Sequence, residues 1–258
     1  MMRQKATHQA TATELTDVLR LAALFALLLP QVAAANTCDT VRFENTSFTT
    51  CEVSAGEDLR LFHTGRSGPL GSFGAVNDQL AAEGKTLGFA MNAGMYHPDR
   101  APVGLLIDQG RTESALVTAA GPGNFGLLPN GVFCIGDRFS VVESRAFAAR
   151  PPRCSFATQS GPMLVIDGAL HPRLIPDSDS TYIRNGVGVS ADGTRAVFAI
   201  SNDRVNFHRF ARFFRDALGL RDALYFDGKI SRLYAPAIRR NDIGFAMGPI
   251  VGTVVNKD

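Results

Sequence analysis

The sequence predicts an α+β fold with a mixed, largely antiparallel β-sheet core, a few flanking helices and a single domain. Short apolar runs bounded by glycine, asparagine or aspartate dominate the chain, and this pattern is typical of strands joined by tight turns. Helical spacing of apolar residues is confined to a few segments. Because strands and helices do not alternate regularly, a doubly wound nucleotide-binding fold is disfavoured.

Strands are expected wherever a short apolar run is bounded by turn residues. These runs cover residues 41–43, 59–62, 87–91, 103–107, 131–135, 139–142, 163–166, 187–189 and 196–200. The clearest hairpin joins the last two strands across Ala191-Asp-Gly-Thr194, and another joins 131–135 to 139–142 across Gly136-Asp-Arg138. Consecutive antiparallel strands therefore make up much of the predicted sheet.

Two helices are predicted from apolar residues at helical spacing. Residues 72–82 form the first, which Gly84 ends, and residues 206–218 form the second, with Gly219 as its C-terminal cap. In the second helix phenylalanines share one face and arginines the other, so the arginines are interpreted as a solvated face.

Residues 1–35 have the pattern of a secretory signal peptide. Basic residues up to Arg20 precede the apolar run 21–29, and small residues ending at Ala35 provide an A-x-A cleavage site. An anchor helix is the alternative, but the apolar run is much shorter than the roughly 20 residues that span a bilayer. We therefore expect a periplasmic or secreted domain, residues 36–258, without a membrane span after cleavage.

The four cysteines all follow the predicted cleavage point and allow three disulfide pairings. Proximity in the sequence favours Cys38–Cys51 and Cys134–Cys154 in an oxidising compartment. Zinc binding is the rival interpretation, but no C-x-x-C spacing or nearby histidine pair supports it.

The composition excludes several functional classes. A formal net charge of +2 on 258 residues offers no basic surface for nucleic acid. The chain has no Walker loop, G-x-G-x-x-G or H-E-x-x-H motif, so the sequence predicts no cofactor and no metal ligands. The histidines are scattered, and only His97 follows a candidate site motif.

Polar, glycine-bearing clusters interrupt the strand ends at five places. They are Met91–Tyr96, Leu128–Gly131, Thr158–Pro162, Tyr182–Gly186 and Phe226–Ser231. Each cluster alone is explained by a turn, but together they supply the directional hydrogen bonds and close backbone approach that a sugar or phosphate pocket needs. The candidate substrate-binding residues are Asn92, Gly94, Asn130, Gln159, Ser160, Gly161, Asn185, Gly228 and Ser231.

The motifs that contain these clusters resemble, in order, those of the phosphodiester glycosidase family. They read MNAGMY, PVGL, PNGVF, TQSGPML, IRNGVGV, NF-x-x-FA-x-x-F and ALYFDG-x-IS-x-LY. The resemblance implies hydrolysis of a glycosyl-1-phosphodiester between the anomeric carbon and the phosphate oxygen, with a carbohydrate phosphate as the partner molecule. It also implies site roles for Asn92, Gln159, Ser160, Arg184, Asp227 and Ser231. Lys229 and Ile230 stand where the family has a more glycine-rich D-G-G-G-S, and Met95 also departs from its pattern.

The resemblance makes Asp227 and Arg184 the candidate catalytic residues. A phosphate leaving group departs without strong acid assistance, so one carboxylate and one cation suffice where most glycosidases need two carboxyl groups. Arg184 is expected to bind the phosphate, while Asp227 activates water or attacks the anomeric carbon. The alternatives are a non-catalytic envelope protein that binds polysaccharide or glycan phosphate, and a Ser160 hydrolase, which lacks the G-x-S-x-G elbow.

Overall fold

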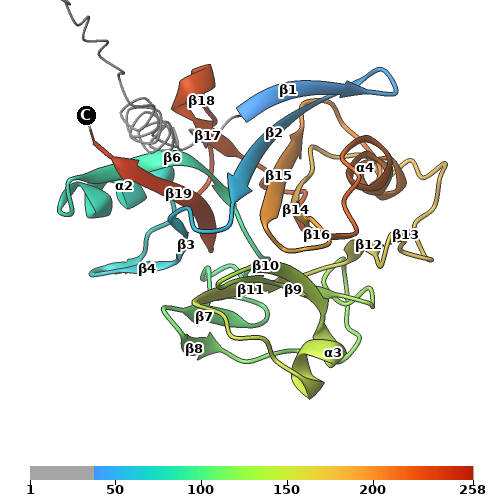
Figure 1. Cartoon of the computed structure of the whole chain (residues 1–258), viewed down its shortest axis with the longest axis horizontal. Coiled ribbons are helices and arrows are strands. Elements are labelled where there is room, and N and C mark those ends of the chain that lie inside the picture. Colours follow the sequence, from blue (N-terminus) through green and yellow to red (C-terminus); the bar gives the residue numbers. More distant parts are fainter. Residues whose placement is uncertain (1–37, 258) are drawn as a thin grey trace, which may run out of the picture. The chain divides into compact units, whose positions relative to one another are not determined.

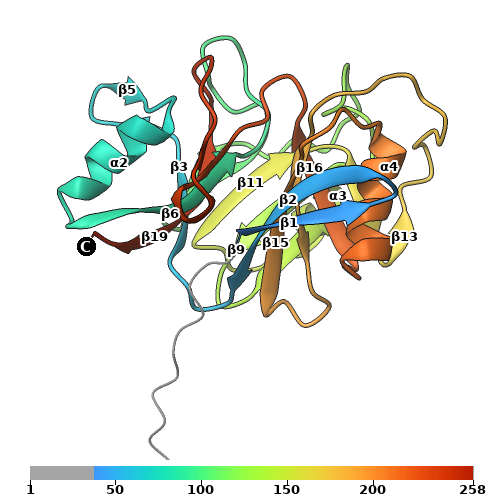
Figure 2. The same cartoon turned by 90° about the horizontal axis from the view of Figure 1, so that it is seen from above.

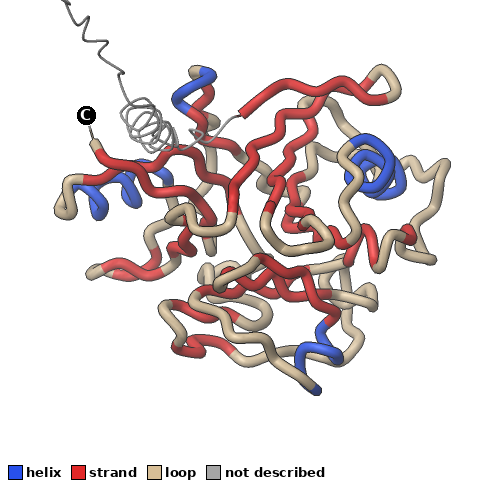
Figure 3. The backbone as a smooth tube through the Cα atoms, viewed as in Figure 1, coloured by secondary structure: helices blue, strands red, loops and turns tan. Residues whose placement is uncertain are grey.

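The computed structural model describes residues 38–257, and the predicted signal peptide lies outside them. Three antiparallel sheets and one short hairpin, β4 (Thr64–Gly65) with β5 (Gly68–Pro69), form the described part of the chain (Figures 1 and 3). The predicted fold class, α+β with a largely antiparallel sheet core, is confirmed. No helix among the described residues is long and apolar enough to cross a bilayer.

The largest sheet has seven strands. Its order is β1 (Cys38–Phe43), β2 (Thr46–Ser54), β15 (Arg195–Ser201), β14 (Asn185–Val189), β16 (Asp222–Asp227), β12 (Met163–Ile166) and β13 (Ala169–Leu170). The predicted hairpin is β14–β15, in which Asn185 lies opposite Ile200 and Val189 opposite Ala196. β14 is buried along its whole length, since strands pair with both of its edges and side chains cover both faces.

The other two sheets have five strands each. One has the order β10 (Phe139–Glu143), β9 (Gly131–Ile135), β11 (Phe156–Ser160), β7 (Leu106–Asp108) and β8 (Arg111–Ser114). The other has the order β18 (Arg240–Asn241), β17 (Leu233–Ala235), β6 (Lys85–Asn92), β19 (Ile250–Asn256) and β3 (Leu59–Phe62). All three sheets contribute to one buried core that includes Phe89, Phe133, Phe198 and Phe226, so the sheets pack as one unit.

Helices lie at opposite ends of this unit, α2 (Phe73–Ala81) at one and α4 (Phe207–Arg212) at the other (Figure 2). The Ser72 hydroxyl caps α2 and accepts from the Ala75 amide at 3.1 Å. The predicted helix 206–218 begins at its Asn206 cap, but it continues as a π-helix, η2 (Phe213–Ala217). The structure also has α3 (Ser144–Ala149) and a short 3₁₀ helix, η3 (Pro236–Ile238).

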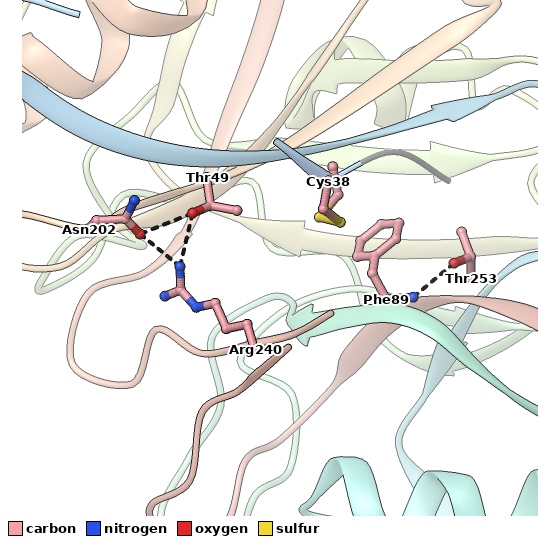
Figure 4. Close-up of a disulfide and its surroundings, with 7 residues drawn as sticks. Cys38, Thr49, Phe89, Asn202, Arg240 and Thr253 are labelled. Atoms are coloured by element: carbon pink, nitrogen blue, oxygen red, sulfur yellow. Dashed lines mark hydrogen bonds between the residues drawn. A yellow bond between two sulfur atoms is a disulfide. The ribbon is translucent and has the colours of Figure 1, made fainter. Parts of the chain in front are cut away.

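One strand prediction needs correction, and two long strands were not expected. The strand expected at 103–107 occupies Leu106–Asp108 instead, because the Leu105 amide donates to the Gln159 side chain rather than to a neighbouring strand. The strands β2 and β19 were not expected from the sequence. β2 is rich in threonine, and the Thr49 hydroxyl is held in a polar cluster with Asn202 and Arg240, close to the Cys38 disulfide (Figure 4).

Both predicted disulfides, Cys38–Cys51 and Cys134–Cys154, are present. Cys134–Cys154 closes a segment with a sequence separation of 20 residues that contains α3. A loop of this size restricts the unfolded chain, so the double variant Cys134→Ala/Cys154→Ala is expected to lose about 3 kcal/mol of unfolding free energy. Urea denaturation without reductant measures the loss, and Cys38→Ala/Cys51→Ala is the matched variant for the shorter loop. An unchanged urea midpoint for both would contradict the expectation.

Candidate active site

Strand ends from two sheets meet at two buried asparagines. β6 ends at Asn92 and β14 begins at Asn185, and the Asn185 Nδ2 donates to the Asn92 backbone carbonyl at 2.7 Å. The Asn185 Oδ1 accepts from the backbone amide of Asp227 at 3.2 Å, while the Asn92 Oδ1 accepts from that of Arg232 at 2.9 Å. The two amides thus fix both ends of the segment 227–232.

Asp227 lies at the end of β16, in a tight turn. Its Oδ1 accepts from the backbone amides of Gly228 and Lys229, at 2.6 and 2.9 Å. The Ser231 hydroxyl lies 2.8 Å from the Asp227 carbonyl and 3.0 Å from the Ile183 carbonyl, so it ties the far end of the turn to β14. The carboxylate is therefore held in one orientation by its own loop.

Asp227 opens into a cavity of about 580 Å³. Its lining combines the Lys229 ammonium and the His97 imidazole with aromatic rings, apolar groups and loop residues. The remaining lining residues are Met95, Tyr96, Val103, Pro122, Gly123, Asn124, Phe125, Ser180, Tyr182, Tyr225, Gly228 and Ile230. Among these described residues Asp227 is the sole carboxylate. A volume of this size accommodates a monosaccharide with a phosphate.

The surroundings set the protonation of the cavity groups. Burial raises the pKa of Asp227, and the backbone amides of Lys229, Gly228 and Ile230 oppose the rise by stabilising the carboxylate. Burial also raises the pKa of Tyr225, so this residue stays a neutral phenol. The pKa of Tyr96 is raised by burial and by the Asp227 charge. The cavity therefore holds a carboxylate of increased basicity beside neutral phenols.

Arg184 lies behind the cavity wall, only 1% exposed. Its Nε donates to the Val205 carbonyl at 2.8 Å and its Nη2 to the Ser180 carbonyl at 2.9 Å, while its Cζ lies 3.7 Å from the Phe207 ring centroid. The remaining contact is from Nη1 to the Tyr225 hydroxyl at 3.3 Å. The expected direct role of Arg184 in phosphate binding does not fit this arrangement, and its link to the cavity is through Tyr225.

The arrangement agrees with a comparison against protein families. Residues 85–246 match the model of the phosphodiester glycosidases, NAGPA, and this range contains all the cavity residues. The chain belongs to the phosphodiester glycosidase family. The predicted resemblance is thereby confirmed, with a glycosidase type of function.

One protein is similar to this chain in sequence, and another is similar in fold. Over 146 residues the chain is 43% identical to the uncharacterized protein YigE of Escherichia coli (strain K12), covering 56% of this chain and 57% of that protein. The match thus spans little more than half the relative's length. The structure resembles the catalytic domain of zebrafish N-acetylglucosamine-1-phosphodiester alpha-N-acetylglucosaminidase, auto-inhibited by its pro-peptide, with a TM-score of 0.56, 13% identity and coverage of 84% and 81% of the two chains. At that identity the likeness concerns the fold.

Most of the other predicted substrate-binding residues form hydrogen bonds within the protein that hold loops in place. Gln159 is fully enclosed, and its Oε1 accepts from the amides of Leu105 and Val117, both at 3.0 Å. Its Nε2 donates to the Ser144 hydroxyl at 2.8 Å. No polar atom of Gln159 is left for a sugar, and the residue instead anchors the segment that carries Val103 to the cavity wall.

Three further predicted site residues contact the backbone of the cavity loops. They are Ser160, Gly161 and Asn130. The buried Ser160 hydroxyl donates to the Phe226 carbonyl at 3.0 Å, which argues against an exposed serine nucleophile. The Asn130 Nδ2 donates to the Phe125 carbonyl at 3.0 Å, and Gly161 packs directly beneath Asn130 and Phe125. These residues position the loop that presents Phe125 to the cavity.

Of the predicted site residues, Asp227 and Gly228 line the cavity, whereas Asn92, Asn185 and Ser231 hold their turn. Tyr225, Tyr182 and Asn124 were missed as site residues. A usable signal existed for Tyr225, because residues two apart on a strand project to the same face, and Tyr225 precedes Asp227 by two positions. Tyr182 and Asn124 are on loops, where no such periodicity applies.

No group of three histidine, cysteine, aspartate or glutamate side chains within residues 38–257 is arranged to hold a metal ion.

Gly94 allows the Asn92 cluster to pack against β11. A Cβ at this position would lie 2.4 Å from the Gln159 carbonyl oxygen and 2.5 Å from the Thr158 Oγ1. Gly94→Ala is expected to lower the unfolding free energy by about 1–3 kcal/mol, because backbone has to move. Gly74→Ala in α2 is the matched control: its nearest neighbour is 3.9 Å away, so a gain of about 0.5–1 kcal/mol is expected. Thermal denaturation of both variants distinguishes close packing from a general intolerance of alanine.

Proposed function

We propose that this protein is an exported hydrolase that cleaves the sugar C1–O bond of a glycosyl-1-phosphodiester similar to N-acetylglucosamine-1-phosphodiester. The observation that carries the proposal is the fixed position of Asp227 as the one carboxylate among the described residues lining the cavity. Family membership supports the same class of reaction.

A single carboxylate suffices because of the leaving group. Glycosidases that release an alcohol require a second carboxyl group as general acid, since an alkoxide leaves poorly. In a phosphodiester the C1–O electron pair remains on the phosphate oxygen, and a phosphate monoester anion is released without prior protonation. Asp227 either removes a proton from the water that attacks C1 or attacks C1 itself, after which water releases the sugar. Both routes place a water oxygen on C1.

In this proposal Lys229 and His97, which line the cavity, bind the phosphate that was first expected to contact Arg184. The Lys229 ammonium is exposed at the mouth of the cavity, and His97 lies on another segment of its lining. We assign phosphate binding to these two side chains. Arg184 acts as a positioning residue, because its guanidinium donates to the Tyr225 hydroxyl and leaves the phenol proton free to bond to the substrate.

Hydrolysis in ¹⁸O-labelled water tests the proposed function. The protein is incubated with UDP-linked N-acetylglucosamine, in which the sugar C1 oxygen is bonded to phosphorus, and the products are analysed by mass spectrometry. The expected result is free sugar carrying ¹⁸O and phosphate product without it. Label in the phosphate would mean cleavage of the P–O bond and would overturn the proposal. Saturable binding without product would instead support the alternative, an envelope protein that binds glycan phosphate.

Export is tested separately from catalysis. Two disulfides among the described residues are compatible with an oxidising compartment. Expression of the full chain in a bacterial host, followed by fractionation and mass spectrometry of the mature protein, is expected to show a periplasmic or secreted product that begins at Asn36. A cytoplasmic product that retains residues 1–35 would contradict export.

A further inference from the structure

Arg232 is a buried cation without an acceptor. It directly follows the turn that holds Asp227, and its backbone amide is fixed by the Asn92 side chain at 2.9 Å. The residue is 8% exposed, yet within residues 38–257 its guanidinium makes neither a hydrogen bond nor an ion pair. Arg184, the other strongly buried arginine, uses all three guanidinium nitrogens in hydrogen bonds to protein oxygens.

The Arg232 side chain lines a second cavity, of about 530 Å³. Polar groups from the end of β15, the Ser231 hydroxyl and the segment around β18 complete its walls. The lining residues are Ile183, Ser201, Asn202, Ser231, Arg232, Arg240, Asn241, Asp242 and Ile243. Asp227 to Ile230 line the first cavity, and the next two residues line the second. One short segment therefore contributes to both cavities.

The other charges in this second cavity are already paired. The Arg240 Nη2 lies 2.9 Å from the Asp242 carboxylate, and its Nη1 donates to Asn202 at 2.7 Å and to Thr49 at 3.0 Å. Figure 4 shows Arg240 held between Thr49 and Asn202. The Asp242 charge is thus compensated by Arg240, and the positive charge of Arg232 is left over.

The guanidinium of Arg232 is partly covered, and its unpaired donors open to the second cavity. Gly244 lies over the guanidinium, since a Cβ there would be 3.1 Å from Cζ and 3.2 Å from Nε. Burial lowers the pKa of Arg232, and the nearby charges of Tyr96 and Asp242 oppose this shift. An anion that accepts from two guanidinium nitrogens at once would supply the missing contacts.

We propose that this second cavity is an anion subsite in which Arg232 binds a phosphate group. The planar guanidinium suits phosphate, because two parallel N–H donors match two phosphate oxygens. The substrate class that follows carries a second phosphate in its aglycone, beyond the scissile phosphate assigned to Lys229 and His97. That assignment of substrate rests on the proposed function, whereas the binding of phosphate by Arg232 does not.

Inorganic phosphate is the probe for this subsite. The full chain, Arg232→Met and Arg66→Met are titrated with phosphate at low ionic strength by calorimetry and by thermal denaturation. Arg66 is the matched control, because it is an exposed arginine that lines a different cavity. Phosphate is expected to raise the Tm of the wild type and of Arg66→Met, while Arg232→Met binds at least tenfold more weakly and its Tm does not respond.

A structural role for Arg232 makes the opposite prediction. Methionine keeps the apolar stem and removes the unpaired charge, so Arg232→Met without phosphate is expected to be at least as stable as the wild type. A lower Tm without phosphate, together with unchanged phosphate affinity, would overturn the subsite. Binding that is equally weak in all three proteins would do the same.

Steady-state kinetics of Arg232→Met and the wild type distinguish failure of the anion subsite from failure of the proposed function. With UDP-linked N-acetylglucosamine, which carries a second phosphate, Arg232→Met is expected to raise KM at least tenfold with little change in kcat. If the wild type cleaves the substrate and the variant keeps its KM and phosphate affinity, the function stands and the subsite fails. If phosphate binding depends on Arg232 but the wild type releases no sugar, the subsite stands and the function fails.

Discussion

Asp227→Asn is expected to reduce turnover of a glycosyl-1-phosphodiester by about 10²- to 10⁴-fold, the usual contribution of a general base. The fold should persist, because an amide oxygen can still accept from the backbone amides of Gly228 and Lys229. Steady-state kinetics and circular dichroism measure the two effects. Asp222→Asn is the matched control: it lies at the other end of the same strand, its pKa is also raised by burial, and it lies outside the cavity lining. Wild-type turnover in Asp227→Asn would remove this residue from the mechanism.

Asp227→Asn is also expected to change the free energy of unfolding in a direction that depends on pH. Because burial raises the pKa of Asp227, the folded state binds a proton more readily than the unfolded state, and ionisation opposes folding. The stability contributed by the protonated form is present below the ordinary carboxyl pKa and is lost as the pH rises through the raised value. Asp227→Asn should therefore be at least as stable as the wild type at pH 7, with the gain disappearing in acid. In the wild type, the acid limb of kcat/KM should lie above the ordinary carboxyl pKa.

Arg184→Met is expected to lower the unfolding free energy by about 2–5 kcal/mol, the largest effect on stability among these variants. The change removes the Arg184 donors to the Val205 carbonyl, which keeps the Tyr182 amide, and to the Ser180 carbonyl. A hydrogen bond that involves a charged group contributes about 1.5–3 kcal/mol. It also removes the cation that lies on the Phe207 ring. Urea denaturation measures the loss.

A comparison of variants distinguishes positioning from direct phosphate binding by Arg184. Arg184→Lys keeps the charge but not the planar donor fork, so it should recover only part of the lost stability. As a positioning residue, Arg184 should affect kcat through Tyr225 in whatever fraction of the variant folds. A raised KM with unchanged stability would instead point to direct contact with phosphate.

Local patterns predicted much of the fold. Turn residues beside apolar runs located the β14–β15 and β9–β10 hairpins, and proximity located both disulfides. β2 was missed because its threonines do not form an apolar run. They are held in place by β15 and Arg240, which come much later in the sequence.

The site was harder to predict, because the residues that contact one another there are distant in the sequence. Family motifs pointed to Asp227, which does line the cavity. They could not show that the Gln159 Oε1 accepts from the amides of Leu105 and Val117, or that the Phe207 ring covers Arg184. Whether a polar side chain faces a ligand or braces a loop depends on these non-local contacts, for which local periodicity has no signal.

The position of β6 has a consequence for the order of folding. β6 carries Asn92 and pairs only with β17 and β19, which come more than a hundred residues later in the chain. Contacts of such long range form slowly, since a large loop must close before they contribute. Asn92 therefore stays unplaced while the earlier hairpins form, and the Asp227 turn gains its anchor only once Ile250 has paired beside it. Removal of Ile250–Asn256 is therefore expected to leave the Asn92 strand without one of its two neighbours.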